Sequence, residues 1–403
     1  MQKSILIIST LDTKGEETFY LKEKIGSMGV KPIMMDLSMG SAGESPAEIT
    51  PAQVAAAGGS SIEKIINSRE RSKITGITIA GASKLAKEYF QSGNIDGVIA
   101  LGGSTGTLMA TEVMRSLPFG IPKLAISSTA ALPGLSTRYI GTGDIILFHS
   151  VIEISGLSDL LKNVMDRAAQ ALVGMVKETV TPPKAAKGKA VAMTMLGPCE
   201  KCASAVRTSL EKAGFQIIGF SAAGVGDRAM EEMIADGFFQ GVIDLAPGGV
   251  GEHLFGFMRD AGPSRMESAG NAGIPQIIST CSVNHMTPSK SKYKPEFHQR
   301  RKFDLDKFRS WLRLSADELK QVADAFAEKL NRARGPVSVV IPQQGWSSVD
   351  APGNPTFDPQ EDALFTRELR DKLKPEIKIL EVDANMEQAE FAAAVIGMAT
   401  ELL

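Results

Sequence analysis

Three short stretches in the first half of the chain carry residue types suited to binding a phosphate group. One is Leu101-Gly-Gly-Ser-Thr-Gly-Thr107, which leads directly into a helical pattern. Glycines let the backbone approach an anion without a Cβ clash, successive N–H groups point at it, and the helix N-terminus adds about half a positive charge. The candidate phosphate-binding residues of this loop are Gly102, Gly103, Ser104, Thr105, Gly106 and Thr107.

The glycine loop matches neither of the common phosphate-binding patterns. The Walker pattern places a Lys after the last glycine, and the dinucleotide pattern follows the first strand, whereas this loop follows the third. The alternative to phosphate binding is a glycine-rich turn between strand and helix, capped by Ser104. Both interpretations stay open at this point.

The other two stretches follow the first and second predicted strands. Thr10-Leu-Asp-Thr-Lys-Gly-Glu16 offers Lys14 to neutralise a phosphate, Asp12 to hold Mg²⁺ and a hydroxyl at Thr13. The alternative makes Asp12 or Thr13 a helix N-cap and Lys14 a solvated charge. In Asp36-Leu-Ser-Met-Gly40, a carboxylate or hydroxyl can meet a ribose or a base edge, or simply end the strand in a turn.

These stretches lie within a regular alternation of short apolar runs and amphipathic segments. This pattern predicts an α/β fold of parallel strands with helices on both faces of the sheet. In the first half, strands are expected at 4–10, 31–37, 97–101 and 123–127. Helices are expected near 16–27, 82–90 and 107–115, and a long one at 151–177.

The second half restarts the same pattern after a segment with a Pro pair and small basic residues. The sequence therefore predicts a nucleotide-binding domain at 1–180, a linker at 181–189 and a second domain at 190–403. Strands of the second domain are expected at 190–196, 216–220, 241–245, 276–279, 337–341 and 377–382, and a last helix at 386–403. Residues 288–314 fit neither a strand nor a helix and are expected to be a basic surface excursion, or else an anion or subunit contact.

Composition excludes several classes of protein. The 403 residues include 44 Lys and Arg against 46 Asp and Glu, so no net charge favours nucleic acid or an anionic membrane. No apolar run approaches the ~20 residues that span a bilayer, and the N-terminus becomes acidic too early for a signal peptide. We expect a cytoplasmic protein whose three cysteines stay reduced.

Those cysteines are the first candidate site of the second domain. Cys199 and Cys202 form a C-x-x-C pair at the start of a helix, and Cys281 and His285 follow a later strand. They could complete a Cys₃His zinc site, but small apolar thiols in loops are the simpler interpretation, so we predict no metal site.

Polar residues at other strand ends suggest acid–base chemistry. Arg228 could clamp an anionic substrate, and His253 is the best general-base candidate because a histidine titrates near neutral pH. The alternative for His253 is a surface histidine at a helix start. A small-molecule metabolite between the domains would be the substrate in this interpretation.

Taken in order, the three phosphate-binding stretches resemble the ATP-binding N-terminal domain family of the tomato mosaic virus resistance protein and its bacterial relatives. The similarity covers nearly the whole chain, and it continues in the segments Ser116–Lys123, Tyr139–Asp144, Ala171–Val176, Gly226–Glu231, Ala272–Gln276 and Asp350–Pro359. Plant members of the family carry an additional C-terminal barrel domain.

The resemblance implies two Rossmann-like subdomains, a homodimer and bound ATP. By position, the ATP-binding residues would be Asp12, Thr13, Lys14, Ser38, Met39, Gly103, Ser104, Thr105 and Gly106. Where the family can carry an Arg before the helix that precedes the glycine strand, this chain has Thr75, which removes one phosphate partner.

We therefore predict a protein that binds ATP or a related nucleotide, with which Mg²⁺ could bind. The alternative is an ATP-dependent or metal-assisted enzyme that acts on a small carboxylate or sugar-derived metabolite. A phosphofructokinase-like or NAD-kinase-like site is a third interpretation, but such sites require an acidic residue where this loop has Ser104 and Thr105.

Overall fold

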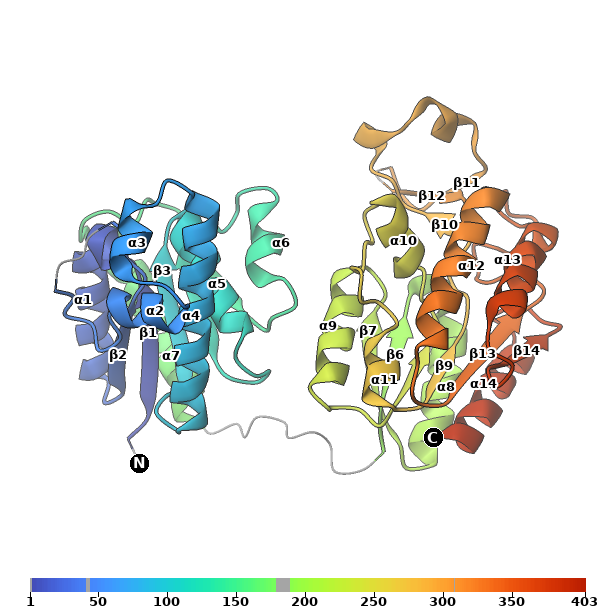
Figure 1. Cartoon of the computed structure of the whole chain (residues 1–403), viewed down its shortest axis with the longest axis horizontal. Coiled ribbons are helices and arrows are strands. Elements are labelled where there is room, and N and C mark those ends of the chain that lie inside the picture. The colour runs from blue at the N-terminus through green and yellow to red at the C-terminus, as the bar shows by residue number, and fades with distance from the viewer. Residues whose placement is uncertain (1, 41–43, 179–188, 308) are drawn as a thin grey trace. The chain divides into compact units, whose positions relative to one another are not determined.

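The chain folds into two α/β units that divide between residues 183 and 184 (Figure 1). The computed structural model describes residues 2–40, 44–178, 189–307 and 309–403. Of the predicted linker at 181–189, all but the last residue lies outside these ranges.

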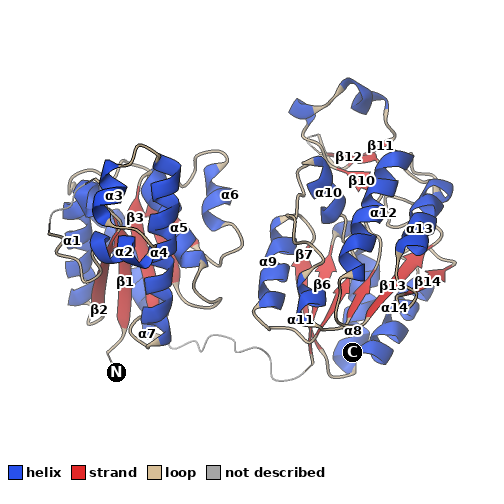
Figure 2. Ribbon diagram, viewed as in Figure 1, coloured by secondary structure: helices blue, strands red, loops and turns tan. Residues whose placement is uncertain are grey.

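The N-terminal unit contains a five-stranded, fully parallel sheet in the order β2-β1-β3-β4-β5 (Figure 2). Its strands are β1 (Ser4–Ser9), β2 (Lys31–Asp36), β3 (Gly97–Gly102), β4 (Lys123–Ser127) and β5 (Ile146–His149). Its helices are α1 (Leu11–Ser27), α2 (Pro51–Ala57), α3 (Ile62–Asn67), α4 (Arg71–Gln91), α5 (Ser104–Arg115), α6 (Leu135–Ile140) and α7 (Asp159–Lys177).

Strand β1 shows why helices cover both faces of this sheet. All of its residues are buried, and neighbouring side chains point to opposite faces. Ile5 and Ile7 pack in the cluster that includes α1 and α7, whereas Leu6 and Ile8 pack in the cluster that includes α4 and α5. The sheet is therefore the middle layer of three.

The C-terminal unit has a six-stranded parallel sheet in the order β14-β13-β9-β8-β6-β7. Its strands are β6 (Ala190–Met195), β7 (Gln216–Ser221), β8 (Gly241–Asp244), β9 (Gln276–Ile278), β13 (Val337–Pro342) and β14 (Lys378–Val382). Its helices are η1 (Gly197–Cys199), α8 (Glu200–Lys212), α9 (Val225–Ala235), α10 (Gly249–Phe255), α11 (Ser268–Ala272), α12 (Ala316–Asn331), α13 (Pro359–Lys372) and α14 (Ala389–Leu402).

Both sheets use the same strand connection. In each, the second strand of the unit lies on one side of the first strand, and the third and later strands lie on the other side of it. This is the flavodoxin-like variant of the doubly wound fold, in which ligands bind at the carboxyl ends of the strands where the order reverses. In the N-terminal unit that point lies between β1 and β3, and in the C-terminal unit between β6 and β8.

The segment expected to be a surface excursion contains regular structure. It includes η2 (Lys290–Lys292), η3 (Pro295–Gln299), β11 (Lys302–Asp304) and β12 (Ser310–Arg313), and β10 (His285–Met286) precedes it. Strands β10 and β11 pair with β12 in an antiparallel three-stranded sheet. These strands were missed because runs of two to four residues are too short to show alternation.

Three predicted helix starts were also wrong. Helix α1 begins at Leu11, with a kink at Lys14, because Gly15 does not break it. Helix α4 extends back to Arg71, and Gly81 inside it permits close packing, since a Cβ there would lie 1.9 Å from the Val54 carbonyl oxygen. Helix α7 begins only at Asp159, after the N-cap Ser158.

Candidate functional site

A cavity of about 830 Å³ lies at the carboxyl ends of β1 and β3 in the N-terminal domain. Its volume is within the usual range for small-molecule and cofactor sites. It is lined by residues from α1, α4, α5 and α6, including the residues that precede α1 and α5, and from the segment after β2, namely Thr10, Asp12, Thr13, Lys14, Met39, Gly40, Arg71, Ser72, Thr75, Gly76, Ile79, Gly103, Ser104, Thr105, Gly106, Leu108, Met109, Glu112 and Arg138.

The glycine loop forms one wall of this cavity with the first turn of α5. Gly103 is the N-cap residue and has no side chain to cap the helix, so the first N–H groups of α5 lack a side-chain partner. A Cβ at Gly106 would meet no atom within 4 Å, so this face of the helix is open. The loop can therefore present backbone donors to an anion.

The first turn of α1 forms the opposite wall. Its backbone is fixed from β2, because Asp36 Oδ1 accepts a 3.0 Å hydrogen bond from the Leu11 N–H and Ser38 Oγ accepts one from the Asp12 N–H. The Lys14 ammonium donates to the carbonyl oxygen of Ile154 and lies 3.8 Å from a Glu153 carboxylate oxygen. Lys14 is thus held in place at the cavity and not free in solvent.

Two arginines that sequence reasoning missed also line the cavity. Arg71 begins α4, and Arg138 lies in α6. Neither has an ionic partner among the residues that the structure describes. The same holds for the Asp12 carboxylate, which lies beside the Gly40 backbone. Among the described residues, the cavity therefore brings together two arginines and one carboxylate that have no ionic partner.

Three of the predicted nucleotide-binding residues do not line the cavity. Thr107 is buried and donates to the Gly102 carbonyl oxygen, with its hydroxyl 2.8 Å from Ser127 Oγ, so it ties α5 to the sheet. Gly102 belongs to β3 itself. Ser38 is buried and donates a 2.5 Å hydrogen bond to Asp36, so its role is to fix the first turn of α1.

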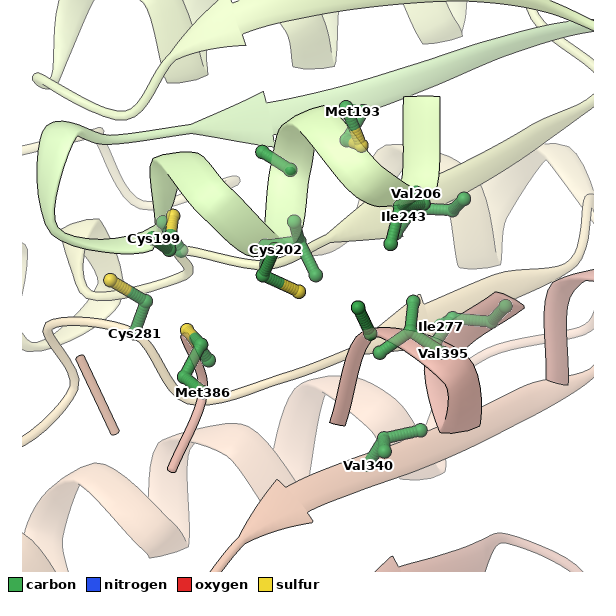
Figure 3. Packing of buried hydrophobic residues seen from close by; sticks show 14 of the residues in the cluster. Met193, Cys199, Cys202, Val206, Ile243, Ile277, Cys281, Val340, Met386 and Val395 are labelled. Atoms are coloured by element: carbon green, nitrogen blue, oxygen red, sulfur yellow. The ribbon is translucent and has the colours of Figure 1, made fainter. Parts of the chain in front are cut away.

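The three cysteines of the C-terminal domain lie in its apolar core. Figure 3 shows Cys199, Cys202 and Cys281 together near Met386, and all three are buried. Burial raises the pKa of Cys202, and a hydrogen bond with Cys199 followed by burial raises that of Cys281. Within the described ranges, no His, Cys, Asp and Glu side chains converge as a metal-ligand set. Buried thiols with raised pKa values are chemically inert.

The two catalytic candidates of the C-terminal domain, Arg228 and His253, both lie beside the segment 260–262. His253 Nδ1 is 2.8 Å from Asp260 Oδ1, and the same oxygen accepts a hydrogen bond from the Gly262 N–H. Arg228 is exposed and packs over Gly262, where a Cβ would lie 3.4 Å from the arginine Cδ. A histidine oriented by a carboxylate can act as a general base.

A buried charged network of this domain surrounds Arg265, which is fully buried. Its guanidinium contacts Asp244 at 2.6 Å, Asp227 at 3.0 Å and Glu231 at 3.2 Å. The partners lie in α9 and β8, and Arg265 itself lies in the loop before α11, so the network joins separate elements of the core. No spacing in the sequence could have predicted it.

The two sheets define the protein as an α/β protein with two doubly wound, Rossmann-like domains. It belongs to the Uncharacterised protein family (UPF0261), because the N-terminal domain of that family matches residues 3–181 and its C-terminal domain matches residues 188–403. The expected family and fold class are therefore confirmed. No helix in the described ranges is both long and apolar enough to span a bilayer.

Relatives with related sequences occur in bacteria and plants. The chain is 33% identical to a UPF0261 protein of Clostridium tetani, over all of this chain and 99% of that protein. It is 36% identical to the ToMV resistance protein Tm-1(GCR237) of Solanum lycopersicum over 82% of this chain. That alignment covers 45% of the tomato protein, so this chain corresponds to less than half of it.

Similarity to solved structures is remote. A putative UDP-N-acetylglucosamine 2-epimerase from Listeria monocytogenes is similar with a TM-score of 0.23 and 11% sequence identity, over 69% of this chain and 79% of that chain. Similarity at this level carries no inference about activity.

Proposed function

We propose that the N-terminal domain binds ATP or a closely related nucleotide, with the phosphate groups on the first turn of α5. The main support is that α5 begins at a glycine without a side-chain cap and faces the cavity. Backbone donors and the positive end of a helix favour an anion at this position. The family resemblance of the glycine loop points to the same ligand.

The side chains around the cavity suit the remaining parts of a nucleotide. Lys14, Arg71 and Arg138 bring positive charge towards the phosphates, and Asp12 offers a carboxylate to Mg²⁺. Met39 and Ile79 provide apolar contacts for a base. The nucleotide is bound by backbone and charge, and no residue here is assigned to its hydrolysis.

Thermal unfolding with and without nucleotide tests this proposal. A ligand at 100 times its Kd stabilises the folded state by about 2.7 kcal/mol, which raises the Tm of a domain of this size by several degrees. Replacement of Gly106 by Leu places a side chain in open space, so the variant should fold normally and lose the shift.

Gly174→Leu is the matched control, because Gly174 also has no atom within 4 Å of its Cβ position and lies in α7, away from the cavity. Its variant should keep the shift. Absence of a shift in the native protein at millimolar ATP, ADP and Mg²⁺ would refute the proposal.

A second candidate function is an enzyme that uses the bound nucleotide. The observation that favours it is the 2.8 Å contact between His253 and Asp260, with Arg228 packed over the neighbouring Gly262. In this interpretation Arg228 holds a carboxylate substrate and His253 removes a proton. ATP turnover measured across a panel of small carboxylates should then depend on the substrate and be lost in His253→Asn. Constant, background turnover with every substrate would exclude it.

A further inference from the structure

The C-terminal domain has a second glycine turn in the topological position of the first. Residues 247–251, Pro-Gly-Gly-Val-Gly, follow β8, which is the third strand of its unit, as residues 103–106 follow β3. Both turns lie beside the point where the strand order reverses, the region where doubly wound sheets bind ligands. The second turn differs from the first in that it is completely buried.

The segment after β9 encloses this second turn. Ser282 lies against Gly248 so closely that a Cβ there would be 2.3 Å from Ser282 Oγ. The Cys281 N–H donates to the Leu245 carbonyl oxygen at 3.0 Å, which fixes the segment along the end of β8. Ser282 has a φ of 59°, a left-handed conformation that is strained for a non-glycine residue. The surrounding structure therefore holds this hydroxyl in a defined position.

Several buried polar side chains of this segment have no hydrogen-bond partner in the described part of the chain. They are Ser279, Thr280 and Ser282 with their hydroxyls, Asn284 with its carbonyl oxygen and His285 with both ring nitrogens. Such groups cost free energy unless they are paired, and unpaired buried groups are rare in native proteins. Their concentration in seven residues of one loop indicates a polar ligand or water beside it.

Arg259 forms an ion pair with Glu252 and still has one guanidinium nitrogen, Nη1, without a hydrogen-bond partner in the described ranges. Its backbone lies next to the glycine turn, because a Cβ at Gly249 would be 3.5 Å from the Arg259 carbonyl oxygen. Its guanidinium donates to Glu252 at 2.8 Å and lies 4.8 Å from the centre of the Trp311 ring, yet Nη1 has no partner in the described ranges. His285 lies on the same indole, with ring centres 5.5 Å apart.

We propose that the C-terminal domain binds a small oxyanion, the carboxylate or phosphate group of a metabolite, at the unpartnered side chains of the segment 279–285, beside the glycine turn 247–251. Arg259 Nη1 and the hydroxyl of Ser282 donate to it, and neighbouring hydroxyls complete the shell. This inference concerns the C-terminal domain alone and does not depend on nucleotide binding by the N-terminal domain.

The donor chemistry selects an oxyanion and not a cation. Hydroxyl, guanidinium and imidazole groups supply N–H and O–H donors, whereas Asn284 Oδ1 is the one unpartnered atom of residues 279–285 that can only accept. Hydrogen bonds from charged donors to an anion are about twice as strong as neutral ones, and more so away from water. The ligand must be small, because every wall of this region is buried.

Tryptophan fluorescence provides a test that reports on this domain alone. The chain has two tryptophans, Trp311 and Trp346, and both lie in the C-terminal domain. In the full-length Trp346→Phe variant, only Trp311 remains, next to Arg259 and His285. Inorganic phosphate and malonate are titrated separately against sodium chloride at equal ionic strength. We expect a saturable change in Trp311 emission with at least one of them. The titrant with the lower Kd shows whether the site prefers a phosphate or a carboxylate group.

Variants of the donors make the test specific. Ser282→Ala and Arg259→Gln in the Trp346→Phe background should weaken binding about tenfold, the usual effect of losing one hydrogen bond to a charged group. Ser338→Ala, a buried serine in β13, is the control and should bind normally. If Arg259→Gln does not fold, Ser282→Ala decides alone, since it removes only a hydroxyl.

Two results would overturn the proposal. One is the absence of any saturable change with phosphate and malonate, and the other is unchanged affinity in Ser282→Ala. The Gly106→Leu variant separates this site from the N-terminal cavity, because it should abolish nucleotide binding and leave the Trp311 response intact.

Discussion

Thr75 Oγ1 donates a 2.8 Å hydrogen bond to the carbonyl oxygen of Arg71, one turn earlier in α4, and both residues line the N-terminal cavity. The hydroxyl of Thr75 is therefore engaged with the backbone of its own helix. Arg71 lies one turn before Thr75, so it brings to this wall of the cavity a positive charge that Thr75 does not carry.

We expect Arg71→Gln to weaken ATP binding by roughly two- to fivefold, the range for exposed charge pairs, with a smaller effect at high salt. Thr75→Arg should strengthen it, because it adds a cation at the same wall. Calorimetric titration at two salt concentrations measures both. Lys73→Gln is the control, since Lys73 is exposed, does not line the cavity and lies 3.7 Å from Glu70. Equal losses in Arg71→Gln and Lys73→Gln would show only a general charge effect.

The Arg265 network predicts a large stability effect without any change at the N-terminal cavity. Arg265→Met leaves Asp227, Glu231 and Asp244 buried without their cation, and such a loss typically costs about 3–5 kcal/mol. Urea unfolding followed by tryptophan emission measures the C-terminal domain, which holds both tryptophans. Arg332→Met removes an exposed pair with Glu328 and should change stability little. Similar small effects in both variants would show that the buried network is not needed.

The fold was predictable from the sequence because each strand and helix is indicated by its own short stretch of residues. Buried parallel strands read as short apolar runs, as in β1, and the polar stretches after them lie at one edge of the sheet. This is why Asp12, Lys14 and the residues from Gly103 to Gly106 were found before their positions were known.

The remaining site residues depend on packing between distant segments. Arg71 and Arg138 reach the cavity only because of where α4 and α6 pack, which no sequence pattern records. The last helix, α14, is apolar because it buries Phe391 and Val395 in the core of its own domain, and this burial gives no evidence of a subunit contact. The homodimer therefore stays a prediction that rests on the family resemblance.

Because His285 is buried, we predict that the protein loses stability at mildly acidic pH. Burial, followed by the charge of Arg313, holds the pKa of His285 well below its usual value. An unfolded histidine titrates near 6.5, so below that pH the unfolded state binds one more proton than the folded state. The free energy of unfolding should then fall as the pH decreases from about 6.5, by up to ~1.4 kcal/mol per pH unit.

The His285→Gln variant should lack this part of the pH dependence, whereas His298→Gln, at an exposed position, should keep it. Burial also raises the pKa of Asp362, so this group makes the free energy of unfolding fall with increasing pH above about pH 3.8, opposite to the effect of His285. The effect of His285 is therefore taken from the difference between variants. Urea unfolding between pH 5 and 8 measures the effect. Parallel curves for the native chain and His285→Gln would contradict the assignment of a neutral His285.

The last prediction is that the C-terminal domain folds without metal and keeps its thiols unreactive. Cys199, Cys202 and Cys281 are buried among apolar side chains, and the pKa values of Cys202 and Cys281 are raised, so the thiolate that reacts or binds zinc is disfavoured. A thiol reagent should therefore modify the native protein slowly, and all three cysteines quickly in urea. Treatment with a chelator should leave thermal unfolding unchanged, because a structural zinc site would contribute folding free energy directly. Stoichiometric zinc in the purified protein, together with a large chelator-induced fall in Tm, would instead place a metal at these cysteines.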